Sequence, residues 1–311
     1  MDRLTSIEVF VLCVEEGSLA AAGRRCGLSA SMAGKHVSAL EAQLTVRLLQ
    51  RSTRSLHLTD AGRAFFARAK RILDDLGEAN REASDAGTLV QGPIRIAAPI
   101  SFGTLHLSAV IIDYLNQHPG VHADVQLDDR YIDLQAAAID VAVRIGILPD
   151  SSLVARRLAP CKMTLCAAPS YCERAGMPAH PDDLARAPLL QFNQAVSVGD
   201  WSLTDTTGRT CRVDGQRRLA SNNMELLLSA ALAGMGVAYG PTFIFGPFIA
   251  SGALLPLLPA WRATELAIYA VYPSARHVPL KVRNFIDFAA NAFGEVPPWD
   301  RAAAPDGRAL G

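Results

Sequence analysis

Apolar side chains recur at helical spacing in three successive segments at the start of the chain. In residues 4–15 they fall three or four positions apart, which predicts an amphipathic helix with one buried face. A second helix is expected behind Ser18, whose hydroxyl suits an N-cap. A third is expected to open at Ser29, and its inward stripe consists of Ala33, Val37, Leu40 and Leu44. We therefore expect a small helical core here.

A tight turn, Cys26-Gly27-Leu28, separates the second helix from the third. Gly27 supplies the positive φ that such a turn demands. Two short helices joined in this way have the proportions of a helix-turn-helix, whose second helix enters the major groove of DNA. The pattern thus predicts DNA binding.

The side of the third helix opposite the inward stripe carries small, polar or basic residues that suit a major groove. Together with the capping serine, the candidate DNA-contacting residues are Ser29, Ala30, Ser31, Gly34, Lys35 and Ser38. Glycine inside a helix costs about 1 kcal/mol relative to alanine. Close approach of the helix backbone to DNA would explain Gly34, and so would genetic drift. The alternative interpretation of the whole face is a solvated helix surface.

The segment QRSTRSLHLTDAG follows, and residues 55–59 alternate as a short strand does. Arg51 and Arg54 flank the bend before it. This pattern predicts a hairpin, or wing, whose arginines contact the DNA backbone or minor groove.

A long helix is expected to begin at Thr59 or Asp60 and to run to about residue 87. Its seam has heptad spacing, which is typical of a helix that pairs with another helix, and consists of Phe66, Ala69, Leu73, Leu76, Asn80, Ala83 and Gly87. Dimerisation is the favoured interpretation because DNA sites are usually bound by symmetric pairs. The alternative is packing against the chain's own domains.

Gln91-Gly92-Pro93 interrupts the helical pattern and marks a domain boundary. Strand and helix signals then alternate, which predicts a mainly parallel sheet with ligand chemistry at the carboxyl ends of its strands. The expected strands are 94–98, 121–127 and 140–146, with more in LVARRLA, KMTLCAA and VAYG, and the expected helices are 103–117, 132–138 and 224–234. The tail from Pro297 is rich in Pro, Ala and Gly and is expected to be disordered.

Charge strengthens the DNA hypothesis only through its distribution. The whole chain has 311 residues, enough for about two domains, and its 30 basic and 30 acidic residues cancel. Residues 24–71, however, hold ten basic side chains and two acidic ones. Such a local excess suits a polyphosphate partner, although a solvated helix face is the alternative.

The sequence lacks the features of secreted, membrane-spanning and metal-binding proteins. Acidic residues interrupt any apolar N-terminal run, so no signal peptide is expected, and no apolar stretch reads as a membrane span. The six cysteines show no metal-ligand spacing, and we expect them to be reduced, buried thiols. The alternative is a redox sensor formed by Cys161, Cys166 or Cys172. We expect a cytoplasmic protein with no metal, no cofactor and no membrane partner.

Over nearly its whole length, the sequence resembles those of the LysR-type transcriptional regulators. The marks are GLSASMAGKHVSALEAQL and RSTRSLHLTDAG in the first part, and GPIRIAAPISFG, IDVAVRIG, LAPCKMTLCAAPSY and AGMGVAYGP in the second. The resemblance implies a winged helix-turn-helix, a dimerising linker helix and a two-lobed α/β effector domain shaped like periplasmic binding proteins.

The implied boundaries are 1–59 for the DNA-binding domain, 60–91 for the linker helix and 92–295 for the effector domain, followed by the tail 296–311. Lobe one would comprise 92–161 and 268–293, and lobe two 162–267. The implied partners are double-stranded promoter DNA, a small-molecule effector and further copies of the chain, as homodimer or homotetramer, with RNA polymerase as an additional candidate. The recognition helix departs from the family at Ala30, Gly34 and Lys35, which leaves the operator sequence open.

Ser101 follows the first strand of the second domain and precedes a helix, a geometry that favours a carboxylate or phosphate. It also matches a position that commonly contacts effector in the family, while a helix cap is the alternative. Asn222 and Asn223 precede another helix, and Arg144 is either a cleft cation or part of a structural ion pair. The candidate set is Ser101, Phe102, Arg144, Phe192, Asn193, Asn222 and Asn223, and the expected effector is an organic or aromatic acid.

Two rival functions have little support. An enzyme of the binding-protein fold would need catalytic motifs, and we find no catalytic residues: no Ser/His/Asp or Cys/His arrangement, no Walker A loop and no HExxH. A secreted solute-binding protein would not need the basic N-terminal segment and would need a signal peptide. We expect a regulator and not an enzyme.

Overall fold

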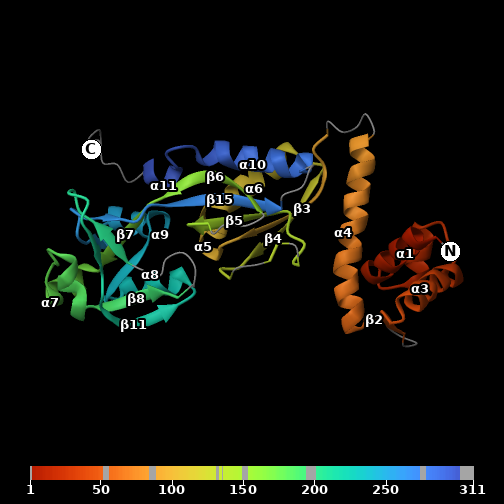
Figure 1. Ribbon diagram of the computed structural model, residues 1–311, viewed down its shortest axis with the longest axis horizontal. Helices are drawn as coiled ribbons and strands as arrows, with labels where there is room; N and C mark the ends of the chain where they lie inside the picture. Colours follow the sequence, from red (N-terminus) through yellow and green to blue (C-terminus); the bar gives the residue numbers. More distant parts are fainter. Residues whose placement is uncertain are drawn as a thin grey trace. The chain divides into compact units, whose positions relative to one another are not determined.

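The computed structural model describes residues 2–51, 56–83, 89–130, 133–134, 136–148, 153–193, 201–273 and 278–301 (Figure 1). The chain forms two compact units, Met1–Leu89 and Val90–Gly311. Each unit has its own buried core and is described separately below.

The first unit begins with three helices, α1 (Arg3–Glu15), α2 (Leu19–Arg25) and α3 (Ala30–Leu44). The side chains of Asp2, Ser18 and Ser29 cap their N-termini. The expected inward stripe of α3 is confirmed, because Ala33, Val37 and Leu40 are fully buried and Leu44 packs against the same cluster. The buried His36 also joins this core, where its Nδ1 lies 2.9 Å from the Ser6 hydroxyl of α1.

The hairpin consists of β1 (Leu49–Arg51) and β2 (Leu56–Leu58), which pair antiparallel. It leads into the long helix α4 (Asp60–Ala83), which lies against α1. The ring centroids of Phe65 and Phe66 lie 5.6 and 6.5 Å from that of Phe10, and Ala69 is buried. The first half of the heptad seam therefore packs within its own unit, which is the alternative that the sequence left open.

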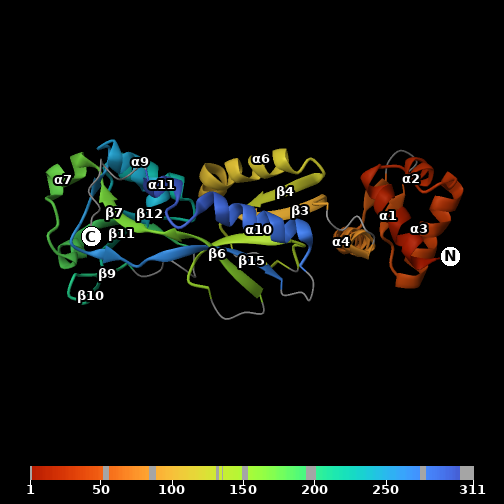
Figure 2. The same cartoon turned by 90° about the horizontal axis from the view of Figure 1, so that it is seen from above.

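The second unit contains two five-stranded sheets. The first has the order β4-β3-β5-β15-β6 and is formed by β3 (Gly92–Ala98), β4 (Val121–Leu127), β5 (Val141–Gly146), β6 (Leu153–Cys161) and β15 (Leu266–Pro273). A helical stretch follows β3, namely α5 (Ile100–Phe102), a π-helical turn (Gly103–Leu107) and α6 (Ser108–Gln117). Tyr114 of α6 meets Phe285 of α10 (Leu280–Phe293), so both helices cover one face of this sheet (Figure 2).

The second sheet has the order β11-β8-β12-β7-β13. Its strands are β7 (Met163–Ala167), β8 (Pro188–Phe192), β11 (Gln216–Ser221), β12 (Val237–Pro241) and β13 (Leu255–Pro256). The helices around it are α7 (Pro169–Ala175), a 3-10 helix (Pro181–Arg186), α8 (Met224–Leu232) and α9 (Thr242–Ala250). A small third sheet joins β9 (Ser202–Thr204) to β10 (Thr210–Arg212) and β14 (Arg262–Ala263).

The expectation of a mainly parallel sheet is wrong. In the first large sheet β3 is parallel to β4 and β5, but β15 lies antiparallel between β5 and β6. In the second, β11, β8 and β12 are parallel, whereas β7 is antiparallel to β12 and β13 is antiparallel to β7. The late strand β15 returns to the first sheet from the second, which local patterns do not reveal.

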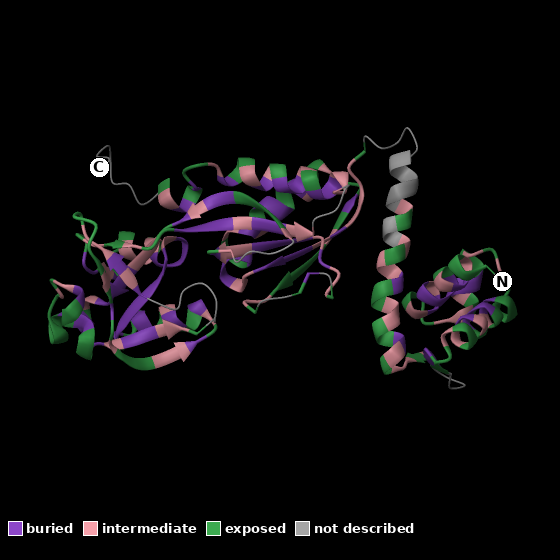
Figure 3. Ribbon diagram, in the orientation of Figure 1, coloured by how far each residue is buried: buried purple, intermediate pink, exposed green. Residues whose placement is uncertain are grey.

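The chain passes from the first large sheet to the second at Lys162 and returns between β14 and β15. Buried side chains of both sheets and of α6, α8, α9 and α10 form one continuous cluster (Figure 3). The expected tail is wrong at its beginning, since α11 (Pro298–Arg301) is helical and the side chain of Trp299 is buried. Within the expected helix 132–138, the described residues 134 and 136–138 form turns.

Candidate functional site

The turn between α2 and α3 is built from the residues that the sequence indicated. Gly27 has a φ of +67°, and the Ser29 hydroxyl accepts a hydrogen bond from the backbone N–H of Met32 at 3.2 Å. Gly23 allows α2 to approach this turn, because an added Cβ would lie 2.8 Å from the Leu28 carbonyl oxygen. The start of α3 is therefore fixed in place by the turn before it.

The outward face of α3 presents the predicted DNA-contacting residues together. Ser29, Ala30, Ser31, Lys35 and Ser38 are exposed, and Gly34 is half-buried between them. Small side chains on either side of one lysine leave the helix backbone accessible to a partner. Met32, 36% exposed, also lies on this end of the helix and was not among the predicted residues.

The hairpin is attached to both neighbouring helices by specific hydrogen bonds. The carboxylate of Glu41 on α3 accepts from the backbone N–H groups of Leu48 and Leu49 at 2.8 and 3.0 Å. Thr59 caps α4 by accepting from the N–H of Gly62 at 2.9 Å, while its own hydroxyl donates to the Arg47 carbonyl at 2.7 Å. Gly62 permits this contact, because a Cβ there would lie 2.0 Å from the Leu48 carbonyl oxygen.

Of the two predicted wing arginines, Arg51 ends β1, where it pairs with Leu56 in the backbone ladder. The side chain of Arg51 and the whole of Arg54 lie outside the described residues. Among the other basic residues of the segment, Arg25 forms an ion pair with Glu16, and Lys70 forms one with Glu15. Arg24, Lys35 and Arg47 are exposed to solvent.

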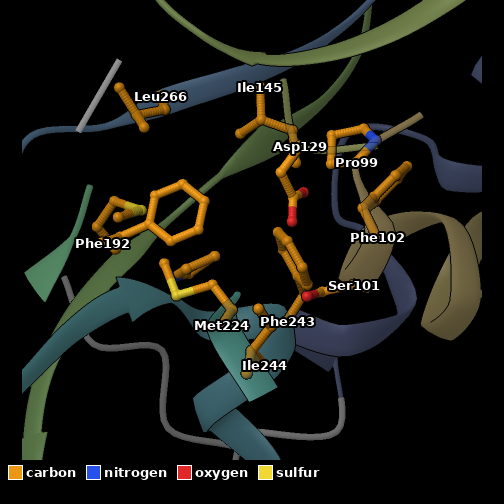
Figure 4. Close-up of a pocket in the computed structure, with 12 residues that line it drawn as sticks. Pro99, Ser101, Phe102, Asp129, Ile145, Phe192, Met224, Phe243, Ile244 and Leu266 are labelled. Carbon is orange, nitrogen blue, oxygen red and sulfur yellow. The ribbon is translucent and has the colours of Figure 1, made fainter. Parts of the chain in front are cut away.

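The second unit contains a pocket of about 110 Å³ where β5, β7, β8, β12 and β15 meet α5, α8 and α9 (Figure 4). Its volume is of the same order as a cavity of roughly 150 Å³ that admits benzene. The walls are mainly apolar and are formed by Pro99, Phe102, Ile145, Met163, Phe192, Met224, Pro241, Phe243, Ile244 and Leu266, with Ser101 and Asp129 as the polar side chains.

The two polar side chains both line the pocket (Figure 4). Ser101 is 5% exposed. One carboxylate oxygen of Asp129 accepts a hydrogen bond from the backbone N–H of Ile100 at 3.0 Å. Burial raises the pKa of Asp129, the Ile100 N–H opposes that shift, and the nearby carboxylates of Glu225 and Asp128 add to it.

The structure brings three of the seven predicted effector residues into this pocket, namely Ser101, Phe102 and Phe192. Arg144 lies elsewhere, because side chains alternate along a strand and its neighbour Ile145 takes the pocket side. Ala142, two residues before Arg144 and so on its face of the sheet, belongs to a separate apolar cluster. The Arg144 side chain is therefore not part of the pocket wall.

The three predicted asparagines are not pocket-lining residues either. Asn193 and Asn222 are exposed at the ends of the adjacent parallel strands β8 and β11. Asn223 is the N-cap of α8, where its side-chain oxygen accepts from the Leu226 N–H at 2.9 Å. That capping role is by itself a sufficient reason for an asparagine before the helix.

Sequence patterns missed several pocket residues. Asp129 follows β4, so the rule that ligands gather at the carboxyl ends of strands could have indicated it. Met163, Met224 and Phe243 come from segments far apart in the chain and are indistinguishable from core residues by pattern. Phe102 and Phe243 are themselves packed edge to face, with ring centroids 5.5 Å apart.

Behind these two rings lies an aromatic cluster that includes the C-terminal helix. The ring of Trp299 lies 5.7 Å from that of Phe102, 6.0 Å from that of Phe243 and 4.5 Å from that of His106. Burial lowers the pKa of His106, whose Nε2 lies 3.2 Å from the Phe243 carbonyl oxygen. The pocket wall is thus supported by α11, which holds no pocket residue.

The six cysteines are free thiols, and burial raises the pKa values of Cys161 and Cys166 to about 12. Thiols with such values are poor nucleophiles at neutral pH. Within the described ranges, no three His, Cys, Asp or Glu side chains form a group that could hold a metal ion. No described helix is long and apolar enough to cross a membrane.

Comparison with known proteins agrees with this architecture. Residues 4–63 match the family of bacterial regulatory helix-turn-helix proteins of the lysR type, and residues 87–294 match the LysR substrate binding domain. The transcriptional regulator PtxR of Pseudomonas aeruginosa is 36% identical over 95% of this chain and 94% of its own length. The transcriptional activator AaeR of Escherichia coli K12 is 33% identical over 95% and 96%.

Solved structures of full-length proteins give the same result. The virulence activator AphB of Vibrio cholerae matches with a TM-score of 0.60 at 29% identity, covering 94% of this chain and 99% of AphB. CrgA of Neisseria meningitidis, a LysR-type transcriptional regulator, matches with a TM-score of 0.58 at 30% identity, covering 92% and 97%. These relatives are transcriptional regulators and not enzymes. The chain belongs to the LysR family of DNA-binding transcriptional regulators, with an N-terminal helix-turn-helix domain and a two-lobed effector-binding domain.

Proposed function

We propose that this regulator binds promoter DNA through the outward face of α3 together with the β1–β2 hairpin. The observation that carries this proposal is the continuous exposed face of Ala30, Ser31, Lys35 and Ser38 beside a hairpin attached to α3 through Glu41. Exposed Arg24 and Arg47 add positive charge to the same unit. A helix with small side chains lets its backbone approach the groove, and the cations bind phosphate.

Lys35→Ala tests this assignment. Loss of one phosphate contact should weaken binding to the protein's own operator and flatten the dependence of log K on log salt by about one unit of slope. Fluorescence anisotropy over a salt series measures both quantities on an operator selected from genomic fragments with the purified protein. Arg186→Ala, an exposed cation of the second unit, serves as the control and should leave the slope unchanged. An unchanged slope for Lys35→Ala would remove it from the interface.

We further propose that the effector of this protein occupies the pocket beside Ser101 and Asp129. The pocket is lined by residues of both large sheets, so a ligand there contacts both lobes at once. A ligand shifts the equilibrium between two arrangements of the lobes only if it binds one arrangement more tightly than the other. Contact with both lobes allows such a difference in affinity. The apolar walls support a small molecule with an aromatic or branched body.

An organic or aromatic acid was expected from the position of Ser101. The pocket supports the aromatic part of that expectation but not the acidic part. No Lys, Arg or His is among the pocket-lining residues that the structure describes, and the Ile100 N–H is already bonded to Asp129. A carboxylate ligand would have to enter beside the carboxylate of Asp129, which is unfavourable unless one of the two is protonated.

A further inference from the structure

The pocket has an acidic hydrogen-bonding end and an apolar remainder. Its polar side chains are Ser101 and Asp129, and its other described lining residues are apolar. Figure 4 shows the Asp129 carboxylate and the Ser101 hydroxyl facing the same space, with Phe192 and Met224 across from them. A ligand that fills this pocket therefore meets a carboxylate and a hydroxyl at one end and aromatic, thioether and aliphatic side chains around the rest.

The Asp129 carboxylate lies at the start of α5, where an anionic ligand would otherwise bind. The backbone N–H at the start of a helix favours a negative charge, and here the Ile100 N–H donates to one oxygen of Asp129 at 3.0 Å. The described part of the chain supplies no donor to the second Asp129 oxygen. Glu225 and Asp128 make the local potential more negative, and Arg130 is engaged with Asp128 at 2.8 Å.

Ser101 provides the second polar atom. Its side chain is 5% exposed, and its hydroxyl makes no hydrogen bond to the described residues. A ligand that excludes water from this hydroxyl compensates the lost water contact only if it forms a hydrogen bond to it. A serine oxygen accepts hydrogen bonds as readily as it donates them, so it suits the same donor group that Asp129 would bind.

Building on the proposed function of this pocket, we propose that the effector is a small aromatic or branched aliphatic amine. Its ammonium group donates to the Asp129 carboxylate and the Ser101 hydroxyl, and its apolar body packs against Phe192, Phe243 and Met224. An ammonium group offers three donors and compensates the buried carboxylate, and charge-assisted hydrogen bonds of this kind are about twice as strong as neutral ones. A carboxylic acid of the same shape has no cation to meet in this wall.

Three ring-matched probes test the proposal on the full-length protein: benzylamine, benzyl alcohol and benzoate. Isothermal titration at neutral pH should rank benzylamine tightest, about tenfold or more above benzoate. Asp129→Asn preserves shape and should reduce benzylamine affinity about tenfold or more while leaving benzyl alcohol within about threefold. Asp113→Asn, an exposed carboxylate on α6, is the matched control and should change none of the three affinities.

Tighter binding of benzoate than of benzylamine would overturn the proposal, and so would an Asp129→Asn variant that keeps the wild-type ranking. Failure of all three rings to bind the folded wild type at millimolar concentration would overturn it as well. The proposed effector function is tested separately by DNA affinity with and without benzylamine. Binding that depends on Asp129 but leaves DNA affinity unchanged would contradict the regulatory role of the pocket and leave its preference for amines intact.

Discussion

The surroundings of Asp129 raise the pKa of its carboxyl group. Burial is the largest cause of its raised pKa, and the Ile100 N–H offsets this only in part. The folded protein therefore holds this proton more tightly than the unfolded chain does. By linkage, the stability contributed by Asp129 is fully present below the unfolded pKa of roughly 3.9 and is lost as the pH rises through the folded pKa.

We therefore predict that the free energy of unfolding of the wild type falls relative to that of Asp129→Asn as the pH rises above the unfolded pKa of roughly 3.9, and that the difference levels off above the folded pKa. The asparagine side-chain oxygen can still accept from the Ile100 N–H, so the comparison isolates the charge. Urea denaturation at a series of pH values, without ligand, measures the difference. A difference that instead grows in favour of the wild type as the pH rises would show that a cation stabilises the carboxylate.

Single residues also show where sequence interpretation works. Ser29, Gly27 and Ser18 were predicted correctly because capping and turn geometry depend on a few neighbouring residues. Arg144 was predicted as a candidate cleft residue, but its neighbour Ile145 lines the pocket instead. Side chains alternate between the two faces of a sheet, so an error of one position moves a side chain to the opposite face. Asp129 was missed because its importance arises from the Ile100 N–H, 29 residues away in the chain.

At the scale of elements, the apolar face of α4 is buried along its first half and exposed further along the helix. Phe66, Ala69 and Leu73 pack in the core of the first unit, whereas Ile72 and Leu76 are 53% and 37% exposed and lie one turn apart. Exposed apolar pairs on a long helix favour contact with another helix. Periodicity predicted the helix and its apolar seam but could not assign each seam residue to a partner.

We predict that the double variant Ile72→Glu, Leu76→Glu shifts the protein toward monomer, because it introduces charge into a helix-pairing surface. Sedimentation velocity over a concentration series measures the mass. Ala67→Glu, an exposed position on the opposite side of α4 from Leu76, should keep the wild-type mass. Equal masses for all three proteins would place the oligomer contact elsewhere.

The two large sheets show how far strand pairing can be predicted from sequence. Individual strands were predicted from their apolar runs. However, β15 lies between β5 and β6 although it follows all strands of the second sheet in the sequence. Such pairing depends on contacts more than a hundred residues apart, for which local pattern holds no signal. The LysR resemblance supplied the two-lobed architecture that periodicity alone did not.

At the scale of the whole second unit, α11 connects segments that lie far apart in the sequence. Trp299 packs against Phe102, His106, Phe243 and Phe293. The adjacent Asp300 accepts from the Thr242 hydroxyl at 2.9 Å. Composition suggested disorder here because Pro and Ala dominate the region, yet a single aromatic side chain is enough to anchor it.

We predict that Trp299→Ala destabilises the second unit by about 3 kcal/mol or more, the usual cost of removing a large buried aromatic side chain. Thermal and urea unfolding of the full chain measure the change. Arg301→Ala, an exposed residue of the same helix, is the control and should cost much less. A Trp299→Ala variant as stable as the wild type would show that α11 contributes no packing energy.

The position of Trp299 also has a spectroscopic consequence. The chain has three tryptophans, and the other two, Trp201 and Trp261, belong to a separate apolar cluster around the second sheet. Among the ring contacts of the described residues, Trp299 is the one tryptophan that packs against rings lining the pocket, namely Phe102 and Phe243. With Trp201 and Trp261 replaced by phenylalanine, the emission of this indole should change when a ligand occupies the proposed effector pocket, so that one intrinsic fluorophore would report binding in real time.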